Sequence, residues 1–141
     1  AQLDIFQVQK VALMQLVMVS SEPEQNVEQA LGEGYLMVDW GLAHALEHRR
    51  MYPDAAEPHV RTGQASIALA HLLGIGGSAY LPARMVADDI ATGQLQMVEH
   101  ARTIELEVYA VFAVRSARTK LIKKVLQLFE YKVDLDELKE Y

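Results

Sequence analysis

Short apolar runs alternate with stretches of helical periodicity along most of the chain, and this alternation limits the possible folds more than any other feature. The runs are nearly continuous in Leu, Val, Met and Tyr, as expected for strands of a sheet that is covered on both faces. They are Leu13–Val19, Tyr35–Trp40, His59–Thr62, Ser78–Leu81 and Glu107–Val114.

Helices are predicted between these runs and after the last one. Their bounds are Leu42–Tyr52, Gln64–Leu73, Pro82–Ala91 and Ala117–Glu130, the last with Ser116 as N-cap, and a short helical turn is expected at Val27–Leu31. Leu42 and Leu46 fall on one side of the first long helix, so that side is expected to face the core. His44 and His48 fall opposite, as on a solvated face.

Strand–helix–strand alternation implies parallel strands joined by right-handed crossovers. The fifth strand follows Leu95–Val98 without a clear helix, so it is expected to run antiparallel. The predicted fold class is therefore α/β: an open, mostly parallel, Rossmann-like sheet with one antiparallel strand. The charged tail 131–141 is expected to be peripheral.

In such sheets, ligands bind beyond the carboxyl ends of the strands. The end of the third predicted strand, Thr62-Gly63-Gln64, is the most suggestive of a ligand site. Thr62 can cap the following helix, whose free N–H groups favour an anion. The structural alternative is that Thr62 only caps the helix and Gly63 only turns the chain. Trp40 ends another strand, where it is either a stacking surface for a ligand or part of the core.

Composition excludes several function classes. The 141 residues make one domain at most, and 51% of them are hydrophobic, which indicates a packed globule. The net charge of −6 argues against this chain gripping nucleic-acid phosphates by itself. The chain has no cysteine, which excludes a disulfide scaffold, a thiolate zinc site and a catalytic thiol.

No apolar run reaches the length of about 20 residues that a membrane-spanning helix needs, and no signal peptide is visible. The first residue is Ala, which we interpret as the mark of a fragment or a processed product.

Two motif matches are rejected because they lie in the wrong structural context. His44-Ala-Leu-Glu47-His48 matches the H-x-x-E-H zinc pattern, but it lies on the helix side taken as solvated and lacks a third ligand. The G-x-G-x-x-A match beginning at Gly74 follows a helix and opens a strand, the reverse of the dinucleotide-binding context. Ser66 and Ser78 have no adjacent base. The residues therefore predict a small α/β ligand-binding module that is not an enzyme, with no metal and no cofactor.

Several segments resemble the effector-binding domain of LysR-type transcriptional regulators. The strand Leu16–Ser21 with Pro23 resembles the one that opens that domain's second subdomain. The family's run of glycine, apolar strand, Leu-Pro, helix, glycine and Leu is matched at Gly76–Pro82, Met85-Val86 and Gly93–Leu95. Val108–Phe112 resembles its late strand and Leu121–Phe129 its final helix. Asp4, Phe6 through Pro23 and Val133–Tyr141 are similar to the subgroup of a repressor of the flagellar master operon.

The resemblance implies a periplasmic-binding-protein-like subdomain at 5–114, with a closing helix and tail at 115–141 that would pack on a first subdomain not present here. It implies a cytoplasmic module that senses a small molecule, forms homo-oligomers (dimer or tetramer), and reaches DNA only through an absent N-terminal helix-turn-helix. The effector-binding residues that it implies are Thr62, Gly63, Gln64 and Ser66, with Trp40 and Ser78 as outer candidates. A lobe of a periplasmic-type solute-binding protein is the main alternative, and a zinc hydrolase and a module that only makes subunit contacts are further ones.

Overall fold

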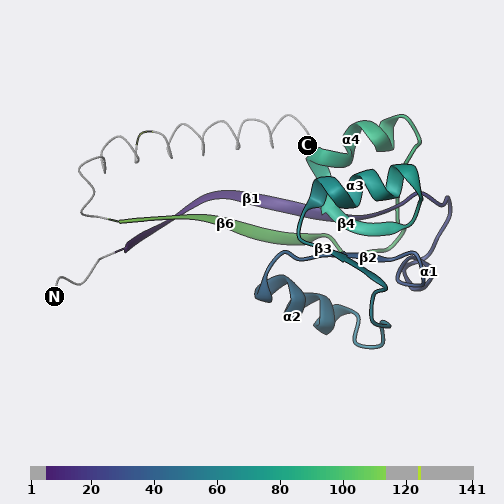
Figure 1. Cartoon of the computed structure of the whole chain (residues 1–141), viewed down its shortest axis with the longest axis horizontal. Coiled ribbons are helices and arrows are strands. Elements are labelled where there is room, and N and C mark those ends of the chain that lie inside the picture. The colour runs from purple at the N-terminus through teal and green to yellow at the C-terminus, as the bar shows by residue number, and fades with distance from the viewer. Residues whose placement is uncertain (1–5, 114–123, 125–141) are drawn as a thin grey trace. The chain divides into compact units, whose positions relative to one another are not determined.

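The computed structural model describes residues 6–113 and Lys124 (Figure 1). The predicted final helix Ala117–Glu130, its cap Ser116 and the tail 131–141 lie outside the described residues, apart from Lys124, which is helical and exposed. The observed elements, in chain order, are β1 (Phe6–Ser20), α1 (Val27–Ala30), β2 (Leu36–Val38), α2 (Leu42–Met51), β3 (Val60–Thr62), α3 (Ala65–Gly74), β4 (Ser78–Pro82), α4 (Ala83–Ala91), β5 (Gln96–Met97) and β6 (Ile104–Ala113).

The order of elements is the predicted one, and the largest difference in bounds is at the first strand. β1 begins at Phe6 rather than at Leu13, because the apolar run continues into an alternating segment that is still extended. The segment Leu95–Val98 contributes β5, which pairs with the end of β1. The short turn at Val27–Leu31 is confirmed as α1, which Asn26 caps by accepting the N–H of Gln29 at 2.8 Å.

The chain divides into two compact units. One is residues 15–104. The other joins the flanking segments 1–14 and 105–141, of which the structure describes 6–14, 105–113 and Lys124. In this flanking unit, Nζ of Lys10 lies 3.4 Å from Oε1 of Glu107, and the Tyr109 hydroxyl donates to the same carboxylate. The topology pairs β6 with β1.

The strands of residues 15–104 belong to two sheets, one with the order β4-β1-β5 and one formed by β2 and β3, and they are less parallel than predicted. β2 and β3 are parallel, and a parallel bridge joins Tyr35 to Ser78 at the start of β4. β1, however, runs antiparallel to both β4 and β5. The prediction of a mostly parallel sheet is therefore right for the β2–β3 pair and wrong for the sheet of β1, β4 and β5. A buried apolar run carries no information about strand direction, and β1 pairs with a strand that follows about 60 residues later in the chain.

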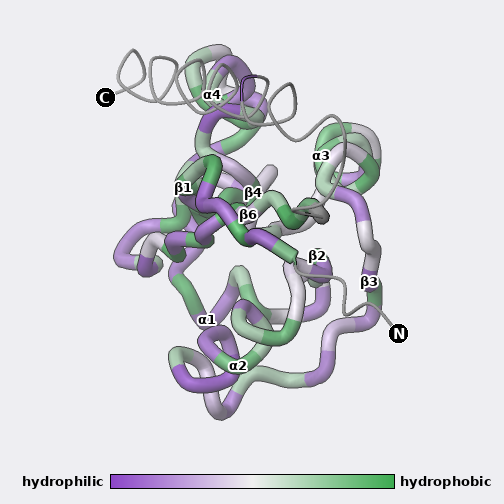
Figure 2. The backbone as a smooth tube through the Cα atoms, turned by 90° about the vertical axis from the view of Figure 1, so that its left-hand side faces the viewer, coloured by the Kyte–Doolittle hydropathy of each residue, from purple (hydrophilic) through white to green (hydrophobic). Residues whose placement is uncertain are grey.

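The two sides of these strands are covered by different helices. Figure 2 shows α3 and α4 on one side of the strands and α1 and α2 on the other. The core cluster, which includes the buried α3 and α4 side chains, is wholly apolar and consists of Val17, Val19, Leu36, Val38, Ala68, Leu72, Ala79, Leu81, Val86 and Leu95. Because strand side chains alternate, Met18 and Tyr80 point to the opposite face. Both are 2% exposed, so that face is buried as well.

A glycine turn brings the chain from α3 into β4. Gly77 has φ +128°, and a Cβ there would lie 2.4 Å from the carbonyl oxygen of Gly34. Its N–H donates to Oγ of Ser21 at 2.8 Å, which ties the turn to the end of β1. Gly74 ends α3 and Ser78 opens β4, so the glycine run does follow a helix and open a strand, as predicted.

Candidate functional site

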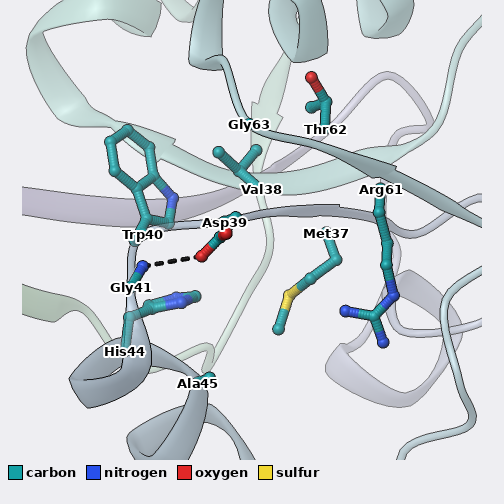
Figure 3. A pocket seen from close by; sticks show the side chains of 10 residues that line it. All are labelled: Met37, Val38, Asp39, Trp40, Gly41, His44, Ala45, Arg61, Thr62 and Gly63. Atoms are coloured by element: carbon teal, nitrogen blue, oxygen red, sulfur yellow. Dashed lines mark hydrogen bonds between the residues drawn. The ribbon is translucent and has the colours of Figure 1, made fainter.

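A pocket of about 300 Å³ lies where β2 and β3 end and α2 begins (Figure 3). We call it the strand-end pocket. It is lined by Met37, Val38, Asp39, Trp40, Gly41, His44, Ala45, Arg61, Thr62 and Gly63. This is the carboxyl edge of the parallel strands, which is where the sequence predicted a ligand site.

The register of β2 and β3 decides which side chains meet here. Met37 pairs with Arg61 and Val38 pairs with Thr62. Because side chains alternate along a strand, the two pairs point to opposite faces. Figure 3 shows Met37 and Arg61 on the side of α2, and Val38 and Thr62 on the other side of the strands. Thr62 therefore sits at the upper rim of the pocket, and Arg61 forms its lower wall.

The starts of α2 and α3 leave backbone donors at this edge. The N-cap residues are Gly41, with φ +95°, and Gln64, and neither makes a side-chain capping bond. Thr62 does not cap α3 in the predicted way. Its hydroxyl accepts the N–H of Gln64 at 3.2 Å, just ahead of the helix. The first N–H groups of both helices thus lack a side-chain partner, and such groups favour polar or anionic ligand atoms.

Opposite charges line the pocket. The Arg61 guanidinium is exposed and lies 2.8 Å from Oε2 of Glu57. The Asp39 carboxylate accepts the N–H of Gly41 at 2.9 Å, which holds it beside the start of α2 (Figure 3). Trp40 adds an aromatic ring whose buried Nε1 has no hydrogen-bond partner within the described part of the chain. Cation, carboxylate, ring and free amides together suit a small polar molecule.

The structure brings together only some of the six candidate residues. Trp40, Thr62 and Gly63 line the strand-end pocket. Gln64 and Ser66 are exposed at the start of α3, next to the pocket but outside its lining. Ser78 is 2% exposed, lies at the amino end of β4, and donates its hydroxyl hydrogen bond to the carbonyl of Ala30. Its position is that of a core residue tying β4 to α1.

Sequence reasoning did not select Arg61, Met37, His44 or Ala45 as site residues. A signal for Arg61 was available, because a charged residue in an otherwise strand-like run just before a strand end tends to face a ligand or solvent. For His44 the signal was misread. The histidines of α2 were assigned to a solvated face, and that prediction is wrong.

Helix α2 buries the face that was predicted to be exposed and exposes the face that was predicted to be buried. His44 and His48 are 2% and 7% exposed, whereas Leu42 and Leu46 are 74% and 57% exposed. Of the two buried histidines, His48 meets a hydroxyl group beside β2. The Tyr35 hydroxyl and Nε2 of His48 form a hydrogen bond of 2.8 Å, and their rings stack with centroids 5.6 Å apart. Leucine side chains could not have satisfied the buried hydroxyl of Tyr35.

The histidines belong to an aromatic cluster between α2 and the sheet, formed by Tyr35, His44, His48, Tyr52 and Tyr80. Tyr80 donates to the carbonyl of Arg102 at 2.7 Å, so Tyr52, whose hydroxyl lies 2.5 Å from that of Tyr80, acts as the donor in their shared bond. Burial raises the pKa of Tyr80, with the Tyr52 hydrogen bond as a second cause, so the Tyr80 hydroxyl stays protonated.

Burial lowers the pKa of both histidines. For His48 the pKa falls to about 4, and the neighbouring His44 contributes to the lowering. For His44 burial is again the main cause, and the Asp39 carboxylate acts against it. Both rings are therefore neutral near pH 7. Nε2 of His44 is buried and has no partner among the residues that the structure describes.

The geometry offers no place for zinc at the H-x-x-E-H match. The two rings face tyrosines, while Glu47 points to the surface, where it pairs with Arg50 at 2.6 Å. Within residues 6–113, no group of three or more His, Cys, Asp or Glu side chains is placed to hold a metal ion. No helix in the described part of the chain is long and apolar enough to cross a membrane.

Comparisons with known proteins match the fold alone. No family model matches the sequence, and no curated protein matches it. Among solved structures, the bromide-bound regulatory domain of HypT from Salmonella typhimurium matches with a TM-score of 0.72 and 17% identity, over 90% of this chain and 66% of that one. Full-length HypT, described as a hypochlorite-specific LysR-type transcriptional regulator, matches with a TM-score of 0.71 and 16% identity, over 90% of this chain and 47% of that one. DarR from Vibrio fischeri, in complex with DNA, matches with a TM-score of 0.61 and 18% identity, over 89% of this chain and 46% of that one.

The chain thus has the fold of the regulatory domains of LysR-type transcriptional regulators, which is periplasmic-binding-protein-like, as the sequence resemblance implied. It spans about two thirds of the HypT regulatory domain and about half of the full-length regulators.

Proposed function

We propose that this chain is the small-molecule-sensing part of a LysR-type transcriptional regulator and that its effector contacts the strand-end pocket. The observation that carries the proposal is the position of the pocket. It lies at the carboxyl edge of β2 and β3, where the start of α2 supplies N–H groups without a side-chain cap and the start of α3 lies next to the lining. Ligands of open α/β sheets bind at this edge. The fold shared with HypT and DarR supports the regulatory role.

In this proposal, residues 5–114 are the second effector-binding subdomain, and residues 115–141 close onto a first subdomain carried by another part of the protein. The module itself is not an enzyme. It works in the cytoplasm as part of a homo-oligomer, and DNA is bound by a separate N-terminal domain. Ligand binding acts by favouring one arrangement of the assembly over another, which requires different affinities for the two arrangements.

The candidate residues other than Ser78 have roles in the proposed contact, and Arg61 joins them. The side chain of Thr62 and the backbone of Gly63 form the upper rim, and Trp40 supplies a ring for stacking. Arg61 is the one cation of the lining and takes any acidic group of the ligand, displacing its exposed contact with Glu57. Gln64 and Ser66 lie next to the rim and contact only ligands that extend beyond it.

Calorimetry of the 141-residue chain against a panel of small carboxylates, phosphates and amino acids tests the proposal. The expected result is at least one ligand whose affinity falls about tenfold or more in Thr62→Ala. Thr92→Ala is the matched control, because the Thr92 hydroxyl is exposed at the end of α4 and bonds only to the carbonyl of Asp89. A ligand that binds both variants as tightly as the unaltered chain would place its site elsewhere.

A further inference from the structure

Helix α2 is held to the sheet by its polar side. The face that it buries carries His44 and His48, and the face that it exposes carries Leu42 and Leu46. On the opposite side of the sheet, α3 is anchored by apolar side chains, Ala68 and Leu72. Docking of α2 therefore depends on the protonation state of two imidazoles and does not rest on the burial of leucines.

The groups that face these imidazoles come from four places. Tyr35 precedes β2, Tyr80 lies in β4, Tyr52 follows α2, and Asp39 precedes α2. The ring centroids of His48 lie 5.3 Å from Tyr52 and 6.1 Å from Tyr80, and those of the two histidines are 5.9 Å apart. Asp39 is the one acidic group among them, and its carboxylate is already bonded to the N–H of Gly41.

A charged imidazole would fit this cluster poorly. The hydroxyl of Tyr35, which can donate to or accept from Nε2 of His48, offers a charged ring only a neutral partner. The rest of the cluster is aromatic, and the second histidine repels a charge on the first. A buried cation without a paired anion is strongly unfavourable, so the structure around it rearranges or the proton is not taken up.

We propose that His44 and His48 are positioning residues of the strand-end pocket: as neutral imidazoles they dock α2, and protonation of either one releases the helix and opens the wall that it gives the pocket. Gly41, His44 and Ala45 form that wall. A second cavity of about 240 Å³, lined in part by Tyr35, His48 and Tyr52, reaches the edge of the cluster. The effect on ligand binding rests on the proposed function above, whereas release of the helix does not.

The single tryptophan of the chain makes the release measurable without any ligand. Trp40 lines the pocket just before α2. Its fluorescence in the 141-residue chain is followed from pH 8 to pH 4, together with far-UV circular dichroism. We expect a Trp40 transition with a midpoint at least one unit below the ordinary histidine value of about 6.5, before the circular dichroism signal is lost.

Variants identify the groups that take up the proton. The double variant His44→Gln, His48→Gln is expected to lose the Trp40 transition, and His59→Gln, His100→Gln, which alters two exposed histidines, is expected to keep it. A transition that survives in the first double variant overturns the proposal. So does a Trp40 signal that changes only when the whole chain unfolds.

Nuclear magnetic resonance titration of the histidine rings in the unaltered chain covers the case in which the double variant does not fold. A His48 ring that titrates below pH 5 in step with the Trp40 transition supports the proposal. A His48 ring that titrates near 6.5, while the chain is folded and α2 stays docked, overturns it. Because no ligand is used, neither result depends on whether the pocket binds an effector.

Discussion

The hydroxyl of Tyr35 lies 2.8 Å from Nε2 of His48, and both side chains are buried. Tyr35→Phe removes the hydroxyl and leaves the imidazole nitrogen buried without that partner. The free energy of unfolding is expected to fall by about 1–3 kcal/mol, measured by chemical denaturation at pH 7. Tyr109→Phe serves as the control, since this exposed hydroxyl bonds only to an exposed carboxylate and its loss is expected to have no measurable effect. Equal effects of the two changes would contradict the role given to the Tyr35–His48 bond.

Stability is expected to fall as the pH drops below 7. The pKa of His48 is lowered to about 4 in the folded chain, whereas in the unfolded chain it returns to about 6.5. The unfolded chain therefore binds the proton first, and the stability present above pH 6.5 is lost as the pH falls toward 4. By linkage, the free energy of unfolding at pH 5 is lower than at pH 7 by on the order of 2 kcal/mol from His48 alone. The lowered pKa of His44 acts in the same direction.

Urea denaturation at the two pH values measures this difference. In His48→Gln the difference is expected to shrink, and in the exposed-site variant His59→Gln it is expected to persist. Stability that does not change between pH 7 and pH 5 would show that the α2 histidines keep ordinary pKa values in the folded chain.

The turn before β4 is expected to tolerate no side chain at Gly77. Its φ of +128° disfavours any L side chain, and a Cβ would lie 2.4 Å from a backbone oxygen of Gly34. Gly77→Ala is expected to destabilise the chain by about 2–4 kcal/mol, measured by thermal or chemical unfolding. Gly74→Ala is the control, because a Cβ at Gly74 meets nothing within 4 Å. A Gly77→Ala variant as stable as the unaltered chain would mean that the turn is built differently.

The outward face of α2 is expected to contribute little to stability. Leu46→Ala should change the free energy of unfolding by no more than about 0.5 kcal/mol, because the side chain is 57% exposed. Leu81→Ala, which removes a fully buried side chain of the core, should cost about 2–5 kcal/mol. If denaturation curves show a large loss for Leu46→Ala, the leucine face of α2 is packed and the orientation described above is wrong.

That orientation also shows what the sequence could not predict. Leu42 and Leu46 have the same spacing as His44 and His48, so periodicity finds two faces of α2 without saying which one is buried. Hydrophobicity alone favours burial of the leucine face. The outcome depends on Tyr35, Tyr52 and Tyr80, which reach the helix from elsewhere in the chain and offer hydroxyls and ring faces to imidazoles.

The elements and their order were predictable because each element has its own local sequence pattern. The direction of β1 was not, since its pairing with β4 joins Leu16 to Pro82 across the length of the domain. The candidate site was predictable at the level of strand ends: Thr62, Gly63 and Trp40 come together at the pocket. Ser78, which begins a strand rather than ending one, lies away from it. Met37 joins the site through the β2–β3 register, which no local pattern contains.

Blocking the strand-end pocket from α2 tests the central claim most directly. Ala45 and Ala43 are both exposed on this helix, and only Ala45 lines the pocket. Ala45→Leu places a larger side chain in the pocket whatever the chemistry of the ligand, and Ala43→Leu adds the same group outside it. For a ligand found by calorimetry, we predict at least tenfold weaker binding to Ala45→Leu and unchanged binding to Ala43→Leu. Equal affinity for both variants and the unaltered chain would contradict the assignment of the effector site to this pocket.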